Sequence, residues 1–361
     1  GEDLTRHDKW LCMMYPRLKL LQKLLADDGV IFISIDDTEC SNLILICNEI
    51  FGASNFVANV SWQRTYSPRN DSKGIVSEVE HLVVFSKNPG WQPNKLPRTE
   101  AMDSRYKNPD NDVAPWKSSD AFAPGAATHQ GMVYAIQHPF TGEMLYPSNG
   151  RCWRYQQSSM LEYMQGWCNY RLENLHDEKE RARVCGIDES AVRKDVLAIV
   201  LEEPLEVSAA KAQKVYNRGR WPGFYFTKGG YGGIARKTYL ENVGGRLPTN
   251  LWMYEETGHT DEAKKELISL FGGRSPFDTP KPTRLLDFVL KVAGTSETLM
   301  LDSFAGSGTT AHAVLNANKA DNGNRHFILI EMMDYADSIT AERVKRVIKG
   351  YGEGKNAVEG T

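Results

Sequence analysis

The stretch from Leu299 to Glu331 constrains the fold of this chain more than any other. An apolar run leads into the turn Asp302–Gly308, a helical segment follows, and a second apolar run ends on Glu331. The glycines of the turn permit a tight bend and let a ligand approach bare backbone, and the helix presents unpaired N–H groups at its positive dipole end. This order of elements predicts a nucleotide-binding half of an open α/β sheet.

The spacing of this stretch leaves the ligand open. The pattern G-x-G-x-x-A from Gly306 also fits the dinucleotide fingerprint, and Glu331 stands where a carboxylate can accept hydrogen bonds from both ribose hydroxyls. Asp302 could face an ammonium group and Phe304 offers an apolar wall beside a sulfonium, and both favour S-adenosylmethionine. A turn without any ligand is the remaining alternative, and Glu331 argues against it.

Composition excludes some classes of protein. The chain has 361 residues, of which 41% are hydrophobic and 25% charged, enough for one large α/β domain with an insertion or for two domains. A formal net charge of −3 confines any nucleic-acid surface to a local patch. The six cysteines lack C-x-x-C or zinc spacing, as expected for free thiols in a reducing cytoplasm. We find no signal peptide, membrane-length apolar run, P-loop or H-E-x-x-H motif, and expect neither a membrane partner nor a metal.

The amino-terminal part begins with a predicted helix. Apolar residues recur at spacings of three and four from Trp10 to Leu25, the pattern of an amphipathic helix. Pro16 predicts that the regular helix begins or kinks there, and Gly29 is expected to cap its carboxyl end.

A second candidate site follows this helix. The continuous apolar run Val30–Ile35 is typical of a parallel strand covered on both faces. Asp36 and Asp37 come next, either as site residues at the carboxyl end of that strand or as caps of a helix over residues 38–51. Two more strands are predicted, over residues 56–62 and 81–86. The polar loop between them carries Arg64 and Arg69, which could reach phosphates; a plain solvated loop is the alternative.

The middle of the chain reads as an insertion. Periodicity fades after Pro89, a hairpin is predicted over Tyr134–Pro147, and charged helices are predicted over Leu161–Val200, with a solvated face over His176–Arg181. The segment Tyr216–Tyr239 has aromatic residues, glycines and no acidic residue. Such a mixture suits nucleic acid, because cations meet phosphates and flat side chains stack on bases; the alternative is a hairpin with core aromatics and solvated charges. Its basic residues are Arg218, Arg220, Lys228, Arg236 and Lys237.

Three helices are predicted in the last third of the chain, over Asp261–Phe271, Pro282–Ala293 and Ser338–Lys349. The second begins at a proline and follows the rigid turn Phe277–Pro282. The tail from Gly350 is glycine-rich and is expected to fray.

These motifs together resemble a known family. The segments His7–Leu18, Asp28–Asp37, Phe51–Phe56, Phe277–Pro282, Asp302–Val314 and Asn324–Glu331 resemble the modification subunit of type III restriction–modification systems, which are β-class, adenine-specific DNA methyltransferases. The resemblance implies a Rossmann-like, S-adenosylmethionine-dependent sheet interrupted by an α+β target-recognition insertion. The implied divisions are a catalytic half over residues 1–90, the insertion over 91–250 and a cofactor-binding half over 251–361.

The resemblance also implies roles, partners and a location. Phe304, Gly306 and Gly308 would line the cofactor pocket, Asp302 would lie near the methionine part and Glu331 at the ribose. Double-stranded DNA, a homodimer, a restriction subunit and a bacterial cytoplasm are implied as well. The remaining expected cofactor residues are Thr279, Lys281, Pro282 and Thr309.

One departure from the family concerns catalysis. The family's Asp-Pro-Pro-Tyr tetrapeptide, which holds a flipped adenine, occurs nowhere in this sequence. We therefore expect no catalytic residue in this chain and little activity from it alone, because the family places that motif before the segment at His7. The rival hypotheses are a non-catalytic DNA-binding module, a stand-alone adenine methyltransferase and a dinucleotide oxidoreductase.

Overall fold

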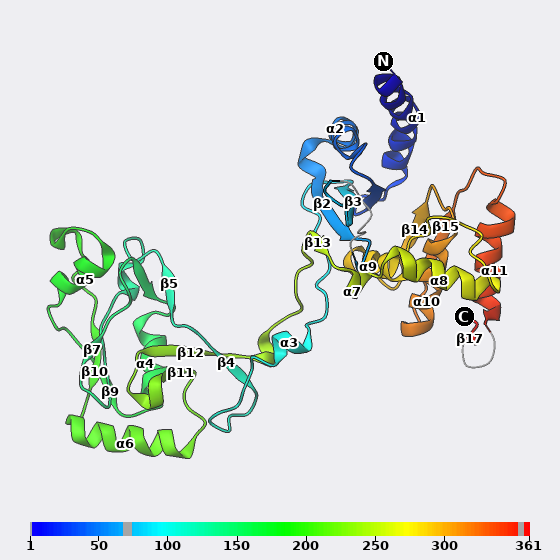
Figure 1. The fold of residues 1–361 in the computed structure, drawn as a ribbon. Helices are drawn as coiled ribbons and strands as arrows, with labels where there is room; N and C mark the ends of the chain where they lie inside the picture. Colours follow the sequence, from blue (N-terminus) through cyan, green and yellow to red (C-terminus); the bar gives the residue numbers. More distant parts are fainter. Residues whose placement is uncertain (1, 68–73, 353–356) are drawn as a thin grey trace. The chain divides into compact units, whose positions relative to one another are not determined.

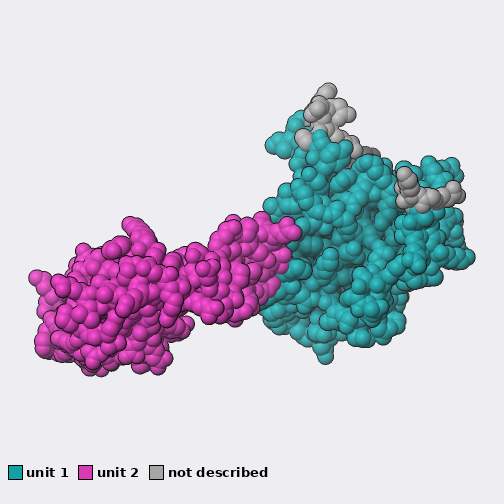
Figure 2. Space-filling view, turned by 90° about the horizontal axis from the view of Figure 1, so that it is seen from below, with its two compact units in different colours: residues 1–97, 246–361 teal, residues 98–245 magenta. Residues whose placement is uncertain are grey.

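The computed structural model describes residues 2–67, 74–352 and 357–361, and the chain forms two compact units (Figure 1). Unit 1 contains residues up to Pro97 and from Arg246 onward, so both ends of the chain contribute to it (Figure 2). Unit 2 contains residues 98–245. The divisions expected from the sequence, at 90/91 and 250/251, lie a few residues from these boundaries.

The larger sheet of unit 1 has the strand order β1-β3-β2-β13. β1 and β2 pair antiparallel with β3, and β13 pairs parallel with β2. The expectation of a parallel strand at residues 30–35 is therefore wrong in its pairing, but both faces of β1 carry apolar contacts: its odd-numbered residues pack with α1 and α2, and Val30 and Phe32 pack on the side of α9. The strands are β1 (Val30–Ile35), β2 (Phe56–Gln63), β3 (Val79–Ser86) and β13 (Leu251–Trp252).

Two helices precede and follow β1. α1 (Glu2–Leu24) is assigned without a break through Pro16, so that proline is not the start of the helix. Gly29 does not cap it: the helix ends earlier, Gly29 is not in the left-handed conformation, and its N–H donates to the carbonyl of Ala26 (2.9 Å). α2 (Cys40–Phe51) buries the apolar side chains that close this part of the core.

The carboxyl-terminal part of unit 1 contains the predicted strand–turn–helix–strand. β14 (Leu299–Asp302) and β15 (His326–Leu329) pair in parallel, and α10 (Thr309–Asp321) connects them. Ala313 and Val314 of α10 pack on Leu290 of α9, which gives this region its own small core. The other helices are α7 (Tyr254–Thr257), α8 (Thr260–Phe271), α9 (Thr283–Ala293) and α11 (Glu342–Lys349).

Two details near the carboxyl end differ from expectation. A π-helical segment, η6 (Ala336–Ala341), precedes α11, so the closing helix is regular only from Glu342. The tail is not wholly frayed, because β16 (Gly350–Tyr351) pairs antiparallel with β17 (Val358–Glu359).

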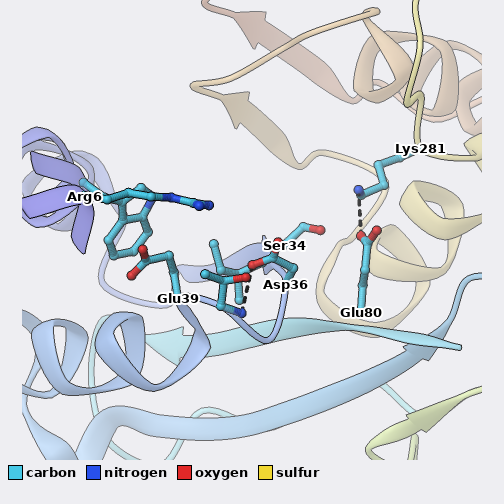
Figure 3. Close-up of a pocket in the computed structure, with 9 residues that line it drawn as sticks. Arg6, Ser34, Asp36, Glu39, Glu80 and Lys281 are labelled. Carbon is cyan, nitrogen blue, oxygen red and sulfur yellow. Dashed lines mark hydrogen bonds and ion pairs between the residues drawn. The ribbon is translucent and has the colours of Figure 1, made fainter. Parts of the chain in front are cut away.

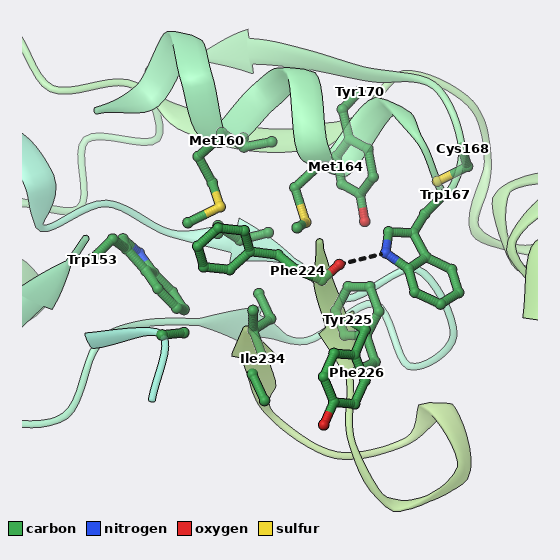
Figure 4. Packing of buried hydrophobic residues seen from close by; sticks show 14 of the residues in the cluster. Trp153, Met160, Met164, Trp167, Cys168, Tyr170, Phe224, Tyr225, Phe226 and Ile234 are labelled. Atoms are coloured by element: carbon green, nitrogen blue, oxygen red, sulfur yellow. Dashed lines mark hydrogen bonds between the residues drawn. The ribbon is translucent and has the colours of Figure 1, made fainter. Parts of the chain in front are cut away.

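Unit 2 is built around an aromatic core (Figure 4). Trp153, Trp167, Phe224 and Phe226 are almost fully buried there, and the indole N–H of Trp167 donates to the carbonyl of Phe224 (3.0 Å). The strands form three sheets, ordered β7-β6-β10-β9, β11-β12-β4 and β5-β8. They are β4 (Trp116–Asp120), β5 (Phe122–Pro124), β6 (Ile136–Gln137), β7 (Met144–Leu145), β8 (Arg151–Trp153), β9 (Tyr170–Glu173), β10 (Ala198–Leu201), β11 (Phe224–Phe226) and β12 (Ile234–Tyr239).

The helices of unit 2 only partly match the sequence prediction. The hairpin predicted over residues 134–147 is confirmed by the antiparallel pairing of β6 and β7. The stretch 161–200, expected to be helical, also contains β9 and most of β10, because Tyr170 of β9 and all four residues of β10 are buried in the core. Arg181 is not solvated: it is 1% exposed and pairs with Asp177. The helices are α3 (Glu100–Asp103), α4 (Gln157–Gln165), α5 (Glu178–Cys185) and α6 (Leu205–Arg218).

Within the residues that the structure describes, no helix combines the length and the apolar character that a membrane span requires.

Candidate functional site

The turn after β14 is organised by the carboxylate of Asp302. One oxygen accepts a hydrogen bond from the backbone N–H of Phe304 (3.1 Å), and the other accepts from the hydroxyl of Thr310 in the first turn of α10 (2.6 Å). Asp302 thus ties the strand to the helix that follows. This is a local task that the sequence prediction, which placed Asp302 beside a ligand, did not include.

Two glycines with positive φ form the turn. Gly306 has φ 52° and Gly308 has φ 78°, a conformation that L-residues with a side chain rarely adopt. A Cβ on Gly308 would lie 3.0 Å from the carbonyl oxygen of Thr340, and one on Gly306 would lie 3.2 Å from the ring of Phe277. Both positions therefore require glycine for the backbone conformation and for the close approach of neighbouring segments.

Glu331 closes the turn from the end of the neighbouring strand. Its carboxylate accepts hydrogen bonds from the backbone N–H of Gly306 (2.8 Å) and of Met333 (3.0 Å), one on each oxygen. Each carboxylate oxygen can accept a further bond, so Glu331 can hold the turn and still accept from a ligand. The glycines and this acid meet at the carboxyl ends of β14 and β15.

The surface beside this turn is apolar. Phe304 is 52% exposed and Met332 is 78% exposed. The ring of Phe277 packs edge-on against Tyr335 (centroids 5.5 Å apart), and partial desolvation together with Glu331 raises the pKa of Tyr335. Flat and apolar side chains next to a carboxylate suit a ligand that has both a sugar and a flat base.

Lys281 joins this turn to a second cluster. Its carbonyl accepts a hydrogen bond from the hydroxyl of Thr309 (3.2 Å), at the start of α10. Its ammonium pairs with Glu80 of β3 (2.8 Å) and lies over the ring of Trp62. Glu80 also accepts from Arg64 (3.1 Å). The backbone of Lys281 is thus fixed at the glycine turn while its charged end reaches the larger sheet.

A cavity of about 420 Å³ opens at that charged end (Figure 3). Asp36 and Glu39 contribute acidic groups, and Arg6 and Lys281 contribute the positive charges. Asp36 was predicted from the sequence as a possible site residue, and it lines this cavity. The other lining residues are Trp10, Ser34, Ile35, Thr38 and Glu80.

The alternative role of the two aspartates as helix caps is not observed. α2 begins at Cys40, and Glu39, which precedes it at the N-cap position, makes no side-chain cap. Asp36 accepts from the backbone N–H of Thr38 (3.1 Å), and Asp37 pairs with the imidazole of His81 (2.8 Å). The hydrogen bond from His81 lowers the pKa of Asp37.

Two of the predicted cofactor residues, Thr309 and Pro282, are buried, whereas Thr279 is exposed. Thr309 is 6% exposed, and its hydroxyl is engaged with Lys281 and Arg343. Pro282 is buried at the amino end of α9, and Thr279 is exposed in the preceding turn. The hydroxyl of Thr309 therefore supports the turn from the interior, and its contact with a cofactor stays a prediction.

The basic and aromatic segment of unit 2 is mostly interior. Phe224 and Phe226 are 1% exposed, which supports the alternative of core aromatics for these rings. The expectation of a phosphate contact is wrong for Lys237, whose fully buried ammonium pairs with Asp110 and Asp112 and donates to the carbonyl of Trp221 (2.8 Å). An ammonium held by two carboxylates in the core is not available to DNA.

The other basic residues are placed differently. Arg218, Arg220 and Lys228 are exposed, whereas Arg236 is half-buried with its Nε in the interior. Arg64 is half-buried and bound to Glu80 rather than free in a loop. Arg69 lies outside the described residues.

No sequence motif indicated Arg343, the buried guanidinium beneath the glycine turn, or the pairing of Glu80 with Lys281. Both are contacts between distant segments, and no local spacing marks them. Among the described residues, no group of three or more His, Cys, Asp or Glu side chains is arranged to hold a metal ion.

Comparison with known proteins now adds to this geometry. A family model described as DNA methylase matches residues 2–342. The chain belongs to the DNA methylase family. The resemblance inferred from the motifs is thereby confirmed at the level of the family, and the mixed α/β architecture is consistent with it.

Several relatives are similar to this chain over nearly its whole length. The type III restriction-modification enzyme StyLTI Mod subunit of Salmonella typhimurium is 31% identical over 95% of this chain and 46% of its own length. The EcoP15I Mod subunit of Escherichia coli is 25% identical over 96% of this chain and 49% of its own length. The type II methyltransferase M.KpnI of Klebsiella pneumoniae is 27% identical over 90% of this chain and 67% of its own length. The chain spans about half the length of the type III relatives that it matches.

Proposed function

We propose that this chain contributes to an enzyme that transfers a methyl group from S-adenosylmethionine to the N6 amine of adenine in double-stranded DNA, within a restriction–modification system. Membership of the DNA methylase family supports the reaction class. The observation that carries the proposal is the glycine turn closed by Glu331 at the carboxyl ends of β14 and β15.

The residues of the turn fit the cofactor. Glu331 can accept from ribose hydroxyls, Phe304 offers an exposed ring, and the glycine at position 306 lets the ring of Phe277 lie close to the turn, where a Cβ would approach it to 3.2 Å. When bound, S-adenosylmethionine supplies the electrophilic methyl group. The role of this chain's residues is to orient the cofactor and to exclude water, which supplies much of the rate in such a transfer.

The finer architecture belongs to the same proposal. We infer a Rossmann-like methyltransferase sheet in unit 1, with residues 1–90 and 251–361 as its two halves, and a target-recognition insertion over 91–250. The match to Mod subunits along nearly the whole chain supports this assignment. A homodimer, a restriction subunit as partner and a bacterial cytoplasmic location are proposed on the same ground.

We place the DNA-contacting surface of unit 2 at the exposed cations Arg218, Arg220 and Lys228. Arg220 (φ 52°) and Lys228 (φ 50°) both adopt the left-handed backbone conformation, which is uncommon for residues other than glycine and often marks functional positions. Tyr231 is 63% exposed and offers a ring for stacking. Arg64 and Arg236 are weaker candidates because each is partly buried.

Calorimetric titration of the chain with S-adenosylmethionine tests the cofactor site. The Glu331→Ala substitution should weaken binding at least tenfold, because it removes a charged acceptor and the contact that closes the turn. Glu297→Ala is the matched control: this exposed acid lies before the amino end of β14, at the opposite edge of the sheet, and should bind normally. Failure of the unaltered chain to bind S-adenosylmethionine would refute the proposal, and tight binding of a nicotinamide cofactor instead would favour an oxidoreductase.

Mass spectrometry of N6-methyladenine in treated duplex DNA tests the reaction. It should be measured with this chain and with the product of the complete coding sequence. Cofactor and DNA binding without any methyl transfer in either preparation would favour a non-catalytic DNA-binding module. Methyl transfer without a restriction subunit would fit either a Mod subunit or a stand-alone methyltransferase. Co-purification of a restriction subunit would favour the Mod subunit.

A further inference from the structure

We propose that Arg343 is a positioning residue for the cofactor turn: its buried guanidinium anchors Ser307 and Thr309 at the end of the turn and couples them to Lys281. This inference rests on the proposed function and adds to it a residue that lies outside the turn and outside the expected ligand contacts.

Arg343 lies at the centre of a polar network inside unit 1. Arg343 is fully buried, with 0% of its surface exposed. One terminal nitrogen, Nη1, donates to the hydroxyls of Ser307 (3.1 Å) and Thr309 (2.8 Å), both of which are buried at the end of the turn. The same guanidinium is therefore bonded to the residues on each side of Gly308.

The other terminal nitrogen anchors the guanidinium to the surrounding helices. Nη2 donates to Glu266 of α8 (2.8 Å), to the hydroxyl of Thr283 at the start of α9 (3.2 Å) and to Nδ1 of His312 in α10 (3.1 Å). Three helices thus determine where the guanidinium sits, and it in turn determines where the turn sits. A planar, permanently charged fork suits this task, because its donors lie in fixed directions.

Thr309 extends the network to the second cluster. Its hydroxyl accepts from Arg343 and donates to the carbonyl of Lys281 (3.2 Å). The backbone of Lys281 is thereby held against the first residue of α10, while its ammonium lies at the cavity shown in Figure 3. A shift of Arg343 would move both the glycine turn and the Lys281 segment.

The π-helical segment η6 brings a second contact from the same part of the chain. The hydroxyl of Thr340 donates to the carbonyl of Gly306 (2.5 Å), and the Thr340 backbone approaches Gly308 closely. π-Helical turns are rare and frequently lie at functional sites. Here the segment places Thr340 and Arg343 against the turn together.

The first test measures S-adenosylmethionine affinity in the full chain. Arg343→Met should weaken binding more than tenfold, and Arg343→Lys should recover part of the loss because an ammonium can still reach one hydroxyl. Thr309→Val keeps nearly the same volume and removes only the hydroxyl, so it tests the network even if Arg343→Met does not fold. It too should weaken binding about tenfold. Arg346→Met is the matched control, since this arginine lies on the same helix and contacts Glu342 and the carbonyl of Leu270; it should lower thermal stability and leave affinity within twofold.

Amide hydrogen exchange supplies a readout that does not depend on the ligand. Exchange at residues 304–308 should accelerate in Arg343→Lys and Thr309→Val, and should stay unchanged in Arg346→Met. If Arg343→Lys and Thr309→Val both bind S-adenosylmethionine and exchange the amides of residues 304–308 as the unaltered chain does, the proposal is overturned. If the unaltered chain does not bind S-adenosylmethionine, the proposed function fails, and the exchange measurement still decides whether Arg343 positions the turn.

Discussion

The turn at residues 302–310 in unit 1 and the turn at residues 218–221 in unit 2 are both held by buried charges. Arg343 holds the first through Ser307 and Thr309. Asp110 holds the second: its carbonyl accepts from the backbone N–H of Arg220 (2.7 Å), and its carboxylate accepts from the N–H of Trp221 (2.7 Å). In each case an ion pair in the core fixes a segment that we propose to contact a ligand.

The two turns differ in what their sequences reveal. The proposed function of the first turn depends on its backbone conformation, and glycines at fixed spacing predict that conformation from the sequence. The second carries its function in exposed cations, and nothing local separates Arg218 from Lys237, although one is exposed and the other is fully buried. A motif with fixed spacing thus predicts a site better than local composition does. Composition does not show which charged side chains are buried, because burial depends on distant partners such as Asp110.

The largest effect expected from this comparison concerns Lys237. Lys237→Met should destabilise unit 2 by roughly 3–5 kcal/mol, because Asp110 and Asp112 would keep their charges in the core without a partner. Chemical denaturation followed by tryptophan fluorescence measures this. A loss below about 1 kcal/mol would mean that the ion pair is solvated and that the contrast between Lys237 and Arg218 is weaker than described.

The polar network of Arg343 beneath the glycine turn should make the folding stability of the chain depend on pH. Burial, followed by the charge of Arg343, lowers the pKa of His312 from 6.5 to about 3. The unfolded chain therefore binds more protons between those values, and folding stability falls as the pH drops below about 6.5. His312 should account for about 3 kcal/mol of the loss between pH 7 and pH 4.

The His312→Asn substitution checks this assignment, because it keeps an acceptor for Arg343 and removes the titrating group. Denaturation midpoints compared at pH 7 and pH 4 should show a shallower acid dependence in the variant. Equal dependence in both proteins would place the acid sensitivity elsewhere.

A pair of glycine substitutions sharpens the comparison between the units. Gly308→Ala should cost about 2–3 kcal/mol, since a left-handed residue with a Cβ is strained and the Cβ would meet the Thr340 carbonyl at 3.0 Å. Gly186→Ala in unit 2 has φ 69° and no atom within 4 Å of the added Cβ, so it should cost only the strain, about 1 kcal/mol. Only Gly308→Ala should also weaken S-adenosylmethionine binding in calorimetry. Equal losses of stability and unchanged binding in both variants would show that the turn tolerates a side chain at position 308.

The smallest effect on stability should come from the exposed cations. Arg218→Ala and Arg220→Ala should each change the free energy of unfolding by less than about 0.5 kcal/mol. Each should nevertheless lower the slope of log DNA affinity against log salt by about one. Fluorescence anisotropy with labelled duplex DNA at several salt concentrations gives that slope, and unaltered slopes would remove these residues from the DNA surface.

The sequence alone determined a good deal of unit 1. The strand–turn–helix–strand, the convergence of Asp302, Gly306 and Glu331 at one sheet edge, and the family were all accessible, because each depends on local spacing and backbone chemistry. The helix preceding β14 was also predicted to within a residue.

Only the tertiary structure decided the rest. It showed that β1 pairs antiparallel with β3, that Thr309 and Lys237 are interior, and that Arg343 lies beneath the glycine turn. These outcomes depend on strand partners and counter-charges that are far away in the chain. A pattern confined to neighbouring residues cannot encode them, because the desolvation cost of a buried charge is compensated only by groups that folding brings together.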